Sequence, residues 1–137
     1  MRRAFAVVPV MALAFAMTGC GSNAKLVGPT WQWIGLTINN PKHQSAVPDP
    51  QNYTLTFMDD GTFQAKADCN QLAGKYTTNG TALKITHGPM TLVACPSGSQ
   101  SDQYVTLLGT VASYSIDGKN LTLNLAKDAG VMGFNEP

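Results

Sequence analysis

Apolar and polar residues alternate along most of the chain after residue 30, which is the pattern of half-buried β-strands. The clearest case is residues 121–125, where three leucines alternate with Thr122 and Asn124, so one strand is expected to bury all three leucines. Turn sequences such as Asp-Asp-Gly, Asn-Gly and Asp-Gly separate the alternating segments. Eight short strands are expected, at residues 31–38, 53–57, 63–68, 74–78, 83–85, 114–116, 121–125 and 131–134.

Three segments depart from this pattern. Residues 39–52 contain three prolines and no periodicity, so we expect a long loop there. Residues 70–73 are expected to form a tight turn. Residues 91–95 are expected to be extended.

Near residue 101 the hydrophobic period changes from two to that of a helix. Four apolar residues lie at positions i, i+3, i+4 and i+7, and Ser101 and Asp102 suit a helix N-terminus. The four residues are Tyr104, Leu107, Leu108 and Val111. The sequence therefore predicts a mainly β fold with one helix near residues 101–111, and short strands joined by tight turns favour a small antiparallel open β-barrel.

The first 25 residues read as an export and anchoring signal. Arg2 and Arg3 precede an apolar run of 14 residues, which is shorter than the ~20 residues that a membrane-spanning helix needs. The run ends in Met-Thr-Gly-Cys at 17–20, which resembles a bacterial lipobox, with Cys20 as the lipid-modified residue. We expect residues 1–19 to be a cleaved signal peptide, 20–25 the lipidated cysteine and its tether, and 26–137 one domain; the alternative is a plain secretory signal.

Such an anchor would place the protein in the bacterial cell envelope, held to the membrane by the acyl chains on Cys20. Neither Gly21 nor Ser22 is acidic, which favours the outer membrane facing the periplasm. Without Arg2 and Arg3, seven lysines stand against eight acidic residues, and no basic cluster is present. Nucleic acid is therefore not an expected partner.

Two cysteines remain once Cys20 is assigned to the lipid. In an oxidising compartment Cys69 and Cys95 are candidates for a disulfide, which would close a loop of about 27 residues and stabilise the fold by about 3.5 kcal/mol. The alternative is two buried free thiols that act as small hydrophobic side chains.

Few residues in the sequence point to catalysis. His43 and His87 are isolated, and no nucleophile elbow or phosphate-binding glycine loop is present, so we expect no enzyme activity, no metal and no cofactor. Trp31 and Trp33 share one face of the first strand. Core packing is one interpretation of this pair, and an aromatic pair that faces a ligand is the other.

The order and spacing of several short motifs resemble the META domain (HslJ-like) family, over about residues 26–134. The chain contains GPTWQW at 28–33, LTFMDDGTF at 55–63, DCN at 68–70, GKY at 74–76, MTLVAC at 90–95, SYSI at 113–116 and LTL at 121–123. The resemblance implies a small open β-barrel with one helix. It also implies an exported lipoprotein linked to stress, drug tolerance or virulence, with no catalytic residues to transfer.

Two classes of function follow from this reading. The first is a non-enzymatic envelope lipoprotein that binds a partner or ligand in stress or drug tolerance. The second is a periplasmic hydrolase inhibitor, or a lipid- or peptide-binding lipoprotein like the pilots of secretin channels, which the family resembles in shape. A protein of this second class would show a defined open groove or a protruding loop, and residues 39–52 are the expected loop.

Overall fold

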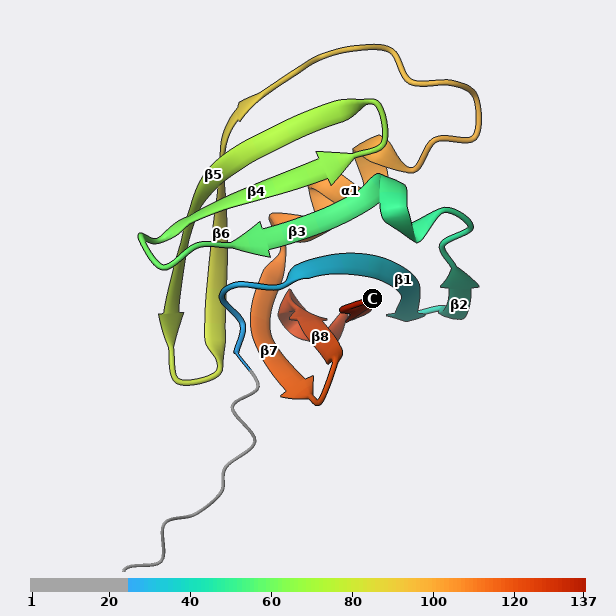
Figure 1. Cartoon of the computed structure of the whole chain (residues 1–137). Helices are drawn as coiled ribbons and strands as arrows, with labels where there is room; N and C mark the ends of the chain where they lie inside the picture. The colour runs from blue at the N-terminus through green and yellow to red at the C-terminus, as the bar shows by residue number, and fades with distance from the viewer. Residues whose placement is uncertain (1–24) are drawn as a thin grey trace, which may run out of the picture.

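The computed structural model describes residues 25–137, so the predicted signal peptide and the lipid site at Cys20 lie outside the described residues. The described chain forms nine strands, one α-helix and two short 3₁₀ helices (Figure 1). In chain order they are β1 (Thr30–Asn39), β2 (Lys42–Ala46), η1 (Pro50–Asn52), β3 (Tyr53–Phe57), β4 (Thr62–Ala67), β5 (Asn70–Asn79), β6 (Ala82–Met90), α1 (Ser101–Leu108), β7 (Val111–Asp117), β8 (Asn120–Leu125), η2 (Ala126–Asp128) and β9 (Gly130–Asn135).

All nine strands belong to one antiparallel sheet that curls into a ring. The hydrogen-bonded order is β2-β1-β3-β4-β5-β6-β7-β8-β9, and β1 also pairs with β9, which closes the ring. The weakest junction is between β6 and β7, where the only paired residues are Ala82 and Ser113. The mainly β fold with one helix is confirmed, with nine strands in place of the eight expected.

The inward face of β8 follows the leucine pattern. Leu121, Leu123 and Leu125 are buried in the ring, and Thr122 and Asn124 are half-exposed. The register predicted for this strand is therefore confirmed. Phe57, Phe63, Phe134 and Met132 are also fully buried, so side chains fill the interior.

A β-bulge in β1 changes which residues face inward. Trp33 pairs with Phe134 and Gly35 with Gly133, so Ile34 is an extra residue that has no partner on β9. Before the bulge the buried side chains are at odd positions, and after it the next buried side chain is Leu36. The bulge thus lets one strand contribute to the core along both halves.

Helix α1 packs against the ring through two of the four residues predicted for its apolar face. Tyr104 and Leu108 are fully buried, whereas Leu107 is only half-buried. Val111 is buried as the first residue of β7, so its assignment to the helix was wrong. Ser101 is the first helical residue and the capping position is Gln100, so the predicted cap lies one residue late.

Two segments expected to be irregular are strands. The expected loop at 39–52 contains β2, whose five residues pair with the end of β1, and the helix η1. The expected turn at 70–73 is the start of β5, which pairs with β4 from Asn70 onward. The reversal between β4 and β5 is shorter than expected, because Asp68 adopts a left-handed conformation with φ of 58°.

Candidate functional site

The two tryptophans singled out from the sequence lie in the core. Trp31 is 1% exposed and its indole N–H donates to the Leu26 carbonyl at 3.0 Å. Trp33 is 0% exposed and donates to the Gly35 carbonyl at 2.9 Å. Both rings are covered and both N–H groups are satisfied within the chain, so the structure supports core packing and offers no surface on which this pair could hold a ligand.

Trp33 belongs to an aromatic cluster that fixes the helix. Its ring stacks on Tyr104 at a centroid distance of 5.2 Å and meets the edge of Tyr53 at 5.7 Å. The Tyr104 hydroxyl donates to the Thr54 carbonyl at 2.8 Å, and burial raises the pKa of Tyr104 well above the ordinary tyrosine value. The Tyr53 hydroxyl accepts the N–H of Gln100 at 2.8 Å, which positions the chain just before α1.

Residues 91–95, which we call the docked segment, connect β6 to the loop before α1 and are held by Asn70. The Asn70 side chain is 3% exposed and its amide pairs with both main-chain groups of Val93. The Val93 N–H donates to Asn70 Oδ1 at 2.8 Å, and Asn70 Nδ2 donates to the Val93 carbonyl at 3.0 Å. The Thr91 hydroxyl also donates to Asn70 Oδ1 at 3.0 Å. The side-chain amide of Asn70 therefore makes the hydrogen bonds that the main chain of a neighbouring β-strand would otherwise make to this segment.

Two further restraints fix the ends of the docked segment. At its start, the Thr91 N–H donates to the Gln71 carbonyl at 3.0 Å, and the Gln71 N–H donates to the Thr91 hydroxyl at 2.9 Å. At its end, Cys95 forms a disulfide with Cys69, with the two Cα atoms 5.5 Å apart. The disulfide expected from the cysteine count is thus present. All of these restraints come from β5 and the turn before it, so they act on one side of the segment.

The other side of the docked segment is apolar and open to solvent. Leu92 is 89% exposed and Val93 is 58% exposed. Sequence reasoning expected an extended chain here but did not single out Leu92, and it placed Asn70 in a turn. The motif Asp-Cys-Asn at 68–70 is part of the family resemblance, and it is the signal that could have found Asn70.

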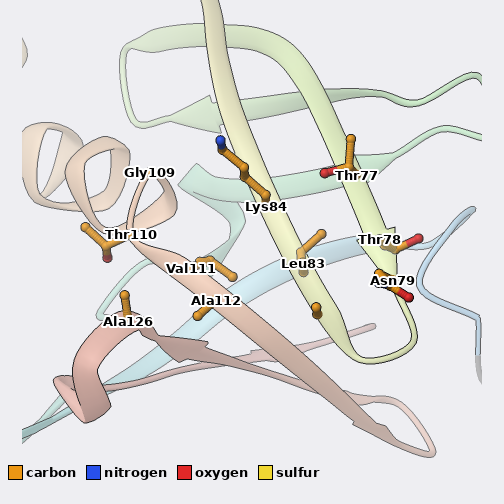
Figure 2. Close-up of a pocket in the computed structure, with 11 residues that line it drawn as sticks. Thr77, Thr78, Asn79, Leu83, Lys84, Gly109, Thr110, Val111, Ala112 and Ala126 are labelled. Carbon is orange, nitrogen blue, oxygen red and sulfur yellow. The ribbon is translucent and has the colours of Figure 1, made fainter.

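A separate groove of about 480 Å³ lies between β6 and β7. Figure 2 shows the two strands diverging, which follows from the bulge at Ala112 and from the single pairing between Ala82 and Ser113. Leu83 and Val111 are among its lining residues, and Lys84 is the charged residue there. This groove contains no acid–base pair among its lining side chains.

Titratable groups are scattered over the described residues. His43 lies exposed on β2 and His87 exposed on β6. Within residues 25–137, no three His, Cys, Asp or Glu side chains gather closely enough to hold a metal ion. The Asp60 carboxylate accepts bonds from the Thr62 hydroxyl and N–H, which lower the pKa of Asp60 and account for this carboxylate as part of a turn.

No helix among the described residues is both long and apolar enough to cross a membrane.

The fold and the docked segment define a small curled-sheet protein that presents an apolar, disulfide-tethered segment on its surface. This chain belongs to the META domain family, whose model matches residues 24–136. No curated protein matches it. A DUF4847 family protein from Bacteroides vulgatus superposes with a TM-score of 0.63 at 16% identity, over 85% of this chain and 98% of that one. A protein from Burkholderia xenovorans superposes with a TM-score of 0.65 at 21% identity, over 82% of this chain and 83% of that one. These two likenesses concern the fold alone.

Proposed function

We propose that this protein is a non-enzymatic, lipid-anchored component of the bacterial cell envelope that binds a partner protein through the docked segment. The observation that carries the proposal is Leu92, a large apolar side chain that is 89% exposed on a segment fixed by buried Asn70. Leaving a leucine in water forgoes about 1.5–3 kcal/mol of burial. A rigidly held apolar pair, Leu92 and Val93, is suited to recover that free energy in a complex.

The proposed lipid anchor at Cys20 is compatible with partner binding at the docked segment. Figure 1 shows the described chain starting at the lower end of the molecule, whereas the connection from β6 to α1 arcs over the upper end. An acyl chain on Cys20, just before the described residues, would leave the docked segment facing away from the membrane. A partner in the periplasm could then reach Leu92. The link of this role to stress or drug tolerance is part of the proposal and comes from the family resemblance.

Of the alternatives, the hydrolase inhibitor gains support from the docked segment. The loop expected for such a role, residues 39–52, forms a polar hairpin strand and a 3₁₀ turn, and it exposes no large apolar side chain. The pilot-like alternative would use a defined open groove, and the groove between β6 and β7 is the candidate, but its lining residues Leu83 and Val111 are already buried within the fold.

The anchor is tested by labelling cells with an alkyne fatty acid. The wild-type protein should take up the label and the Cys20→Ala variant should not. Equal labelling of the two proteins would contradict the anchor. The variant keeps every residue that the structure describes, so a loss of label cannot be explained by a change in the folded domain.

Partner binding is tested with a photoreactive amino acid placed at position 92 in the anchored protein. We expect a discrete crosslinked product from position 92 that is absent when the same residue replaces His43, an exposed residue on β2. The product should weaken in the Asn70→Ala background, where the segment loses its clamp. The same products from both positions, or none from position 92, would contradict binding through the docked segment.

A further inference from the structure

The main-chain groups of the docked segment alternate between the body of the protein and solvent. The N–H of Thr91 donates to the Gln71 carbonyl, the N–H of Val93 donates to Asn70 Oδ1, and the Val93 carbonyl accepts from Asn70 Nδ2, so these three groups face inward. In an extended chain successive residues direct their N–H and C=O groups to opposite sides. No bond within the described residues engages the N–H of Leu92 or Ala94, and we infer that these groups, with those of Met90 at the end of β6, are turned outward.

This set of free groups corresponds to what a serine peptidase uses when it binds an extended peptide. The peptide lies along the cleft like an added strand, and the main-chain groups of alternate residues bond to the enzyme. The enzyme contacts the main chain of the residue just before the scissile bond, which is the central residue. It also contacts the residues two positions before and two positions after that central residue. The side chain of the central residue fills the specificity pocket, which in some enzymes is an apolar slot. With Leu92 at the centre, the three contacting residues are Met90, Leu92 and Ala94.

We propose, on the basis of the binding role above, that the partner is a serine peptidase with an apolar specificity pocket and that the Leu92–Val93 peptide bond is its reactive site. Leu92 enters the pocket, and the exposed segment occupies the cleft as a substrate does. Because the segment is already held in place, little conformational entropy is lost on binding. Protease–inhibitor complexes of about 800 Å² per partner owe their tight binding to such preorganisation.

The same restraints explain why the bound segment would act as an inhibitor and not as a substrate. Attack by the serine hydroxyl on the Leu92 carbonyl forms an ester bond and breaks the bond to the Val93 nitrogen, which takes up the proton that the hydroxyl has lost. In an ordinary substrate the freed amine then diffuses away. Here Asn70 Oδ1 holds the Val93 nitrogen, and the disulfide at Cys95 fastens the chain behind it.

The acyl side is fastened to the same amide, because the Thr91 hydroxyl also donates to Asn70 Oδ1. The amine therefore stays beside the ester, attacks it, expels the serine oxygen with its proton and restores the peptide bond. Asn70 is thus a positioning residue for both halves of the reactive site, and it touches the peptidase at neither.

The test uses the full mature chain in detergent and measures the inhibition of purified peptidases with apolar specificity pockets and of peptidases with acidic pockets, which accept basic side chains. We expect the wild-type protein to inhibit the apolar class with a submicromolar constant. Leu92→Asp should weaken that inhibition by about 100-fold, as expected for removal of a central anchor. Leu92→Lys should transfer inhibition to the peptidase with the acidic pocket, whose carboxylate pairs with a lysine side chain. Ile34→Ala, a change at an exposed apolar residue in the β1 bulge, should leave inhibition unchanged.

A second measurement separates the role of Asn70 from that of Leu92, the residue that enters the specificity pocket. Asn70→Ala should turn the protein into a substrate, with cleavage between Leu92 and Val93 detected by mass spectrometry after reduction. A wild-type protein that inhibits neither class, or a Leu92→Lys variant that inhibits no peptidase with an acidic pocket, would overturn the proposal. If crosslinking from position 92 still captures a partner, the proposed binding role survives that failure; if it also fails, both are overturned.

Discussion

Removal of the Asn70 side chain is the perturbation with the most specific expected effect. Asn70→Ala deletes the bonds to the Val93 N–H at 2.8 Å, to the Val93 carbonyl at 3.0 Å and from the Thr91 hydroxyl at 3.0 Å. A neutral hydrogen bond contributes about 0.5–1.5 kcal/mol net, and the Val93 groups can turn to water once the segment loosens. We therefore expect the free energy of unfolding to fall by about 2–4 kcal/mol in urea melts.

The matched control is Asn124→Ala, which gives up one half-exposed bond to Ser113. We expect it to cost about 1 kcal/mol or less. An Asn70→Ala variant within about 0.5 kcal/mol of wild type would refute the argument that this amide holds the docked segment. Equal losses in Asn70→Ala and Asn124→Ala would refute it as well.

Asn70→Asp probes the donor half of the amide separately. The carboxylate keeps the acceptor for the Val93 N–H but places a charged oxygen opposite the Val93 carbonyl, in a site that is 3% exposed. Burial and the carbonyl both raise the pKa of the introduced carboxyl above its unfolded value. The contribution of the introduced carboxyl to the free energy of unfolding is then complete below its unfolded pKa near 4, and it is lost as pH rises through its folded pKa. Its deficit relative to wild type should be larger at about pH 7 than at about pH 3.5; a deficit that does not change with pH would contradict this.

Three further predictions concern the framework. Leu123→Ala should cost about 2–5 kcal/mol in denaturant melts, because the side chain is fully buried, and a cost below that of Asn124→Ala would show that the register is wrong. Alkylation of the unfolded, unreduced protein should find neither Cys69 nor Cys95 free, and reduction should lower the free energy of unfolding by about 3.5 kcal/mol; two reactive thiols would contradict the bridge. Burial raises the pKa of Tyr104, so the contribution of this side chain to the free energy of unfolding is complete below the unfolded tyrosine pKa near 10. That contribution is lost as pH rises through the folded pKa. Stability should therefore fall less steeply above about pH 10 in Tyr104→Phe, and identical slopes would contradict this.

The parts of the fold that the sequence predicted are those whose pattern is local. The leucines of β8 and the apolar face around Tyr104 each repeat with the period of their element, so burial could be assigned without knowledge of the neighbours. The bulge at Ile34 could not be assigned in this way. Whether an extra residue is inserted in β1 depends on its pairing with β9, about 100 residues away in the sequence.

Strand β2 and Asn70 were missed for two different reasons. Strand β2 has the sequence Lys-His-Gln-Ser-Ala and buries none of its side chains, so it has no apolar alternation and forms only because it extends the edge of β1. Asn70 has the residue type of a turn, but its amide is buried against residues 91–95, more than 20 positions further along the chain. A long-range partner of this kind leaves no periodic signal in the sequence.

The most direct test of the central claim, that the docked segment is held on one side and free on the other, is hydrogen exchange of its amides by NMR. The N–H of Val93 is bonded to buried Asn70 Oδ1, whereas the N–H groups of Leu92 and Ala94 have no hydrogen-bond partner among the described residues. We expect Val93 to exchange slowly and its two neighbours to exchange at close to the rate of an unstructured peptide, with the protection at Val93 lost in Asn70→Ala. Exchange at Val93 as fast as at Leu92 in the wild-type protein would contradict the account.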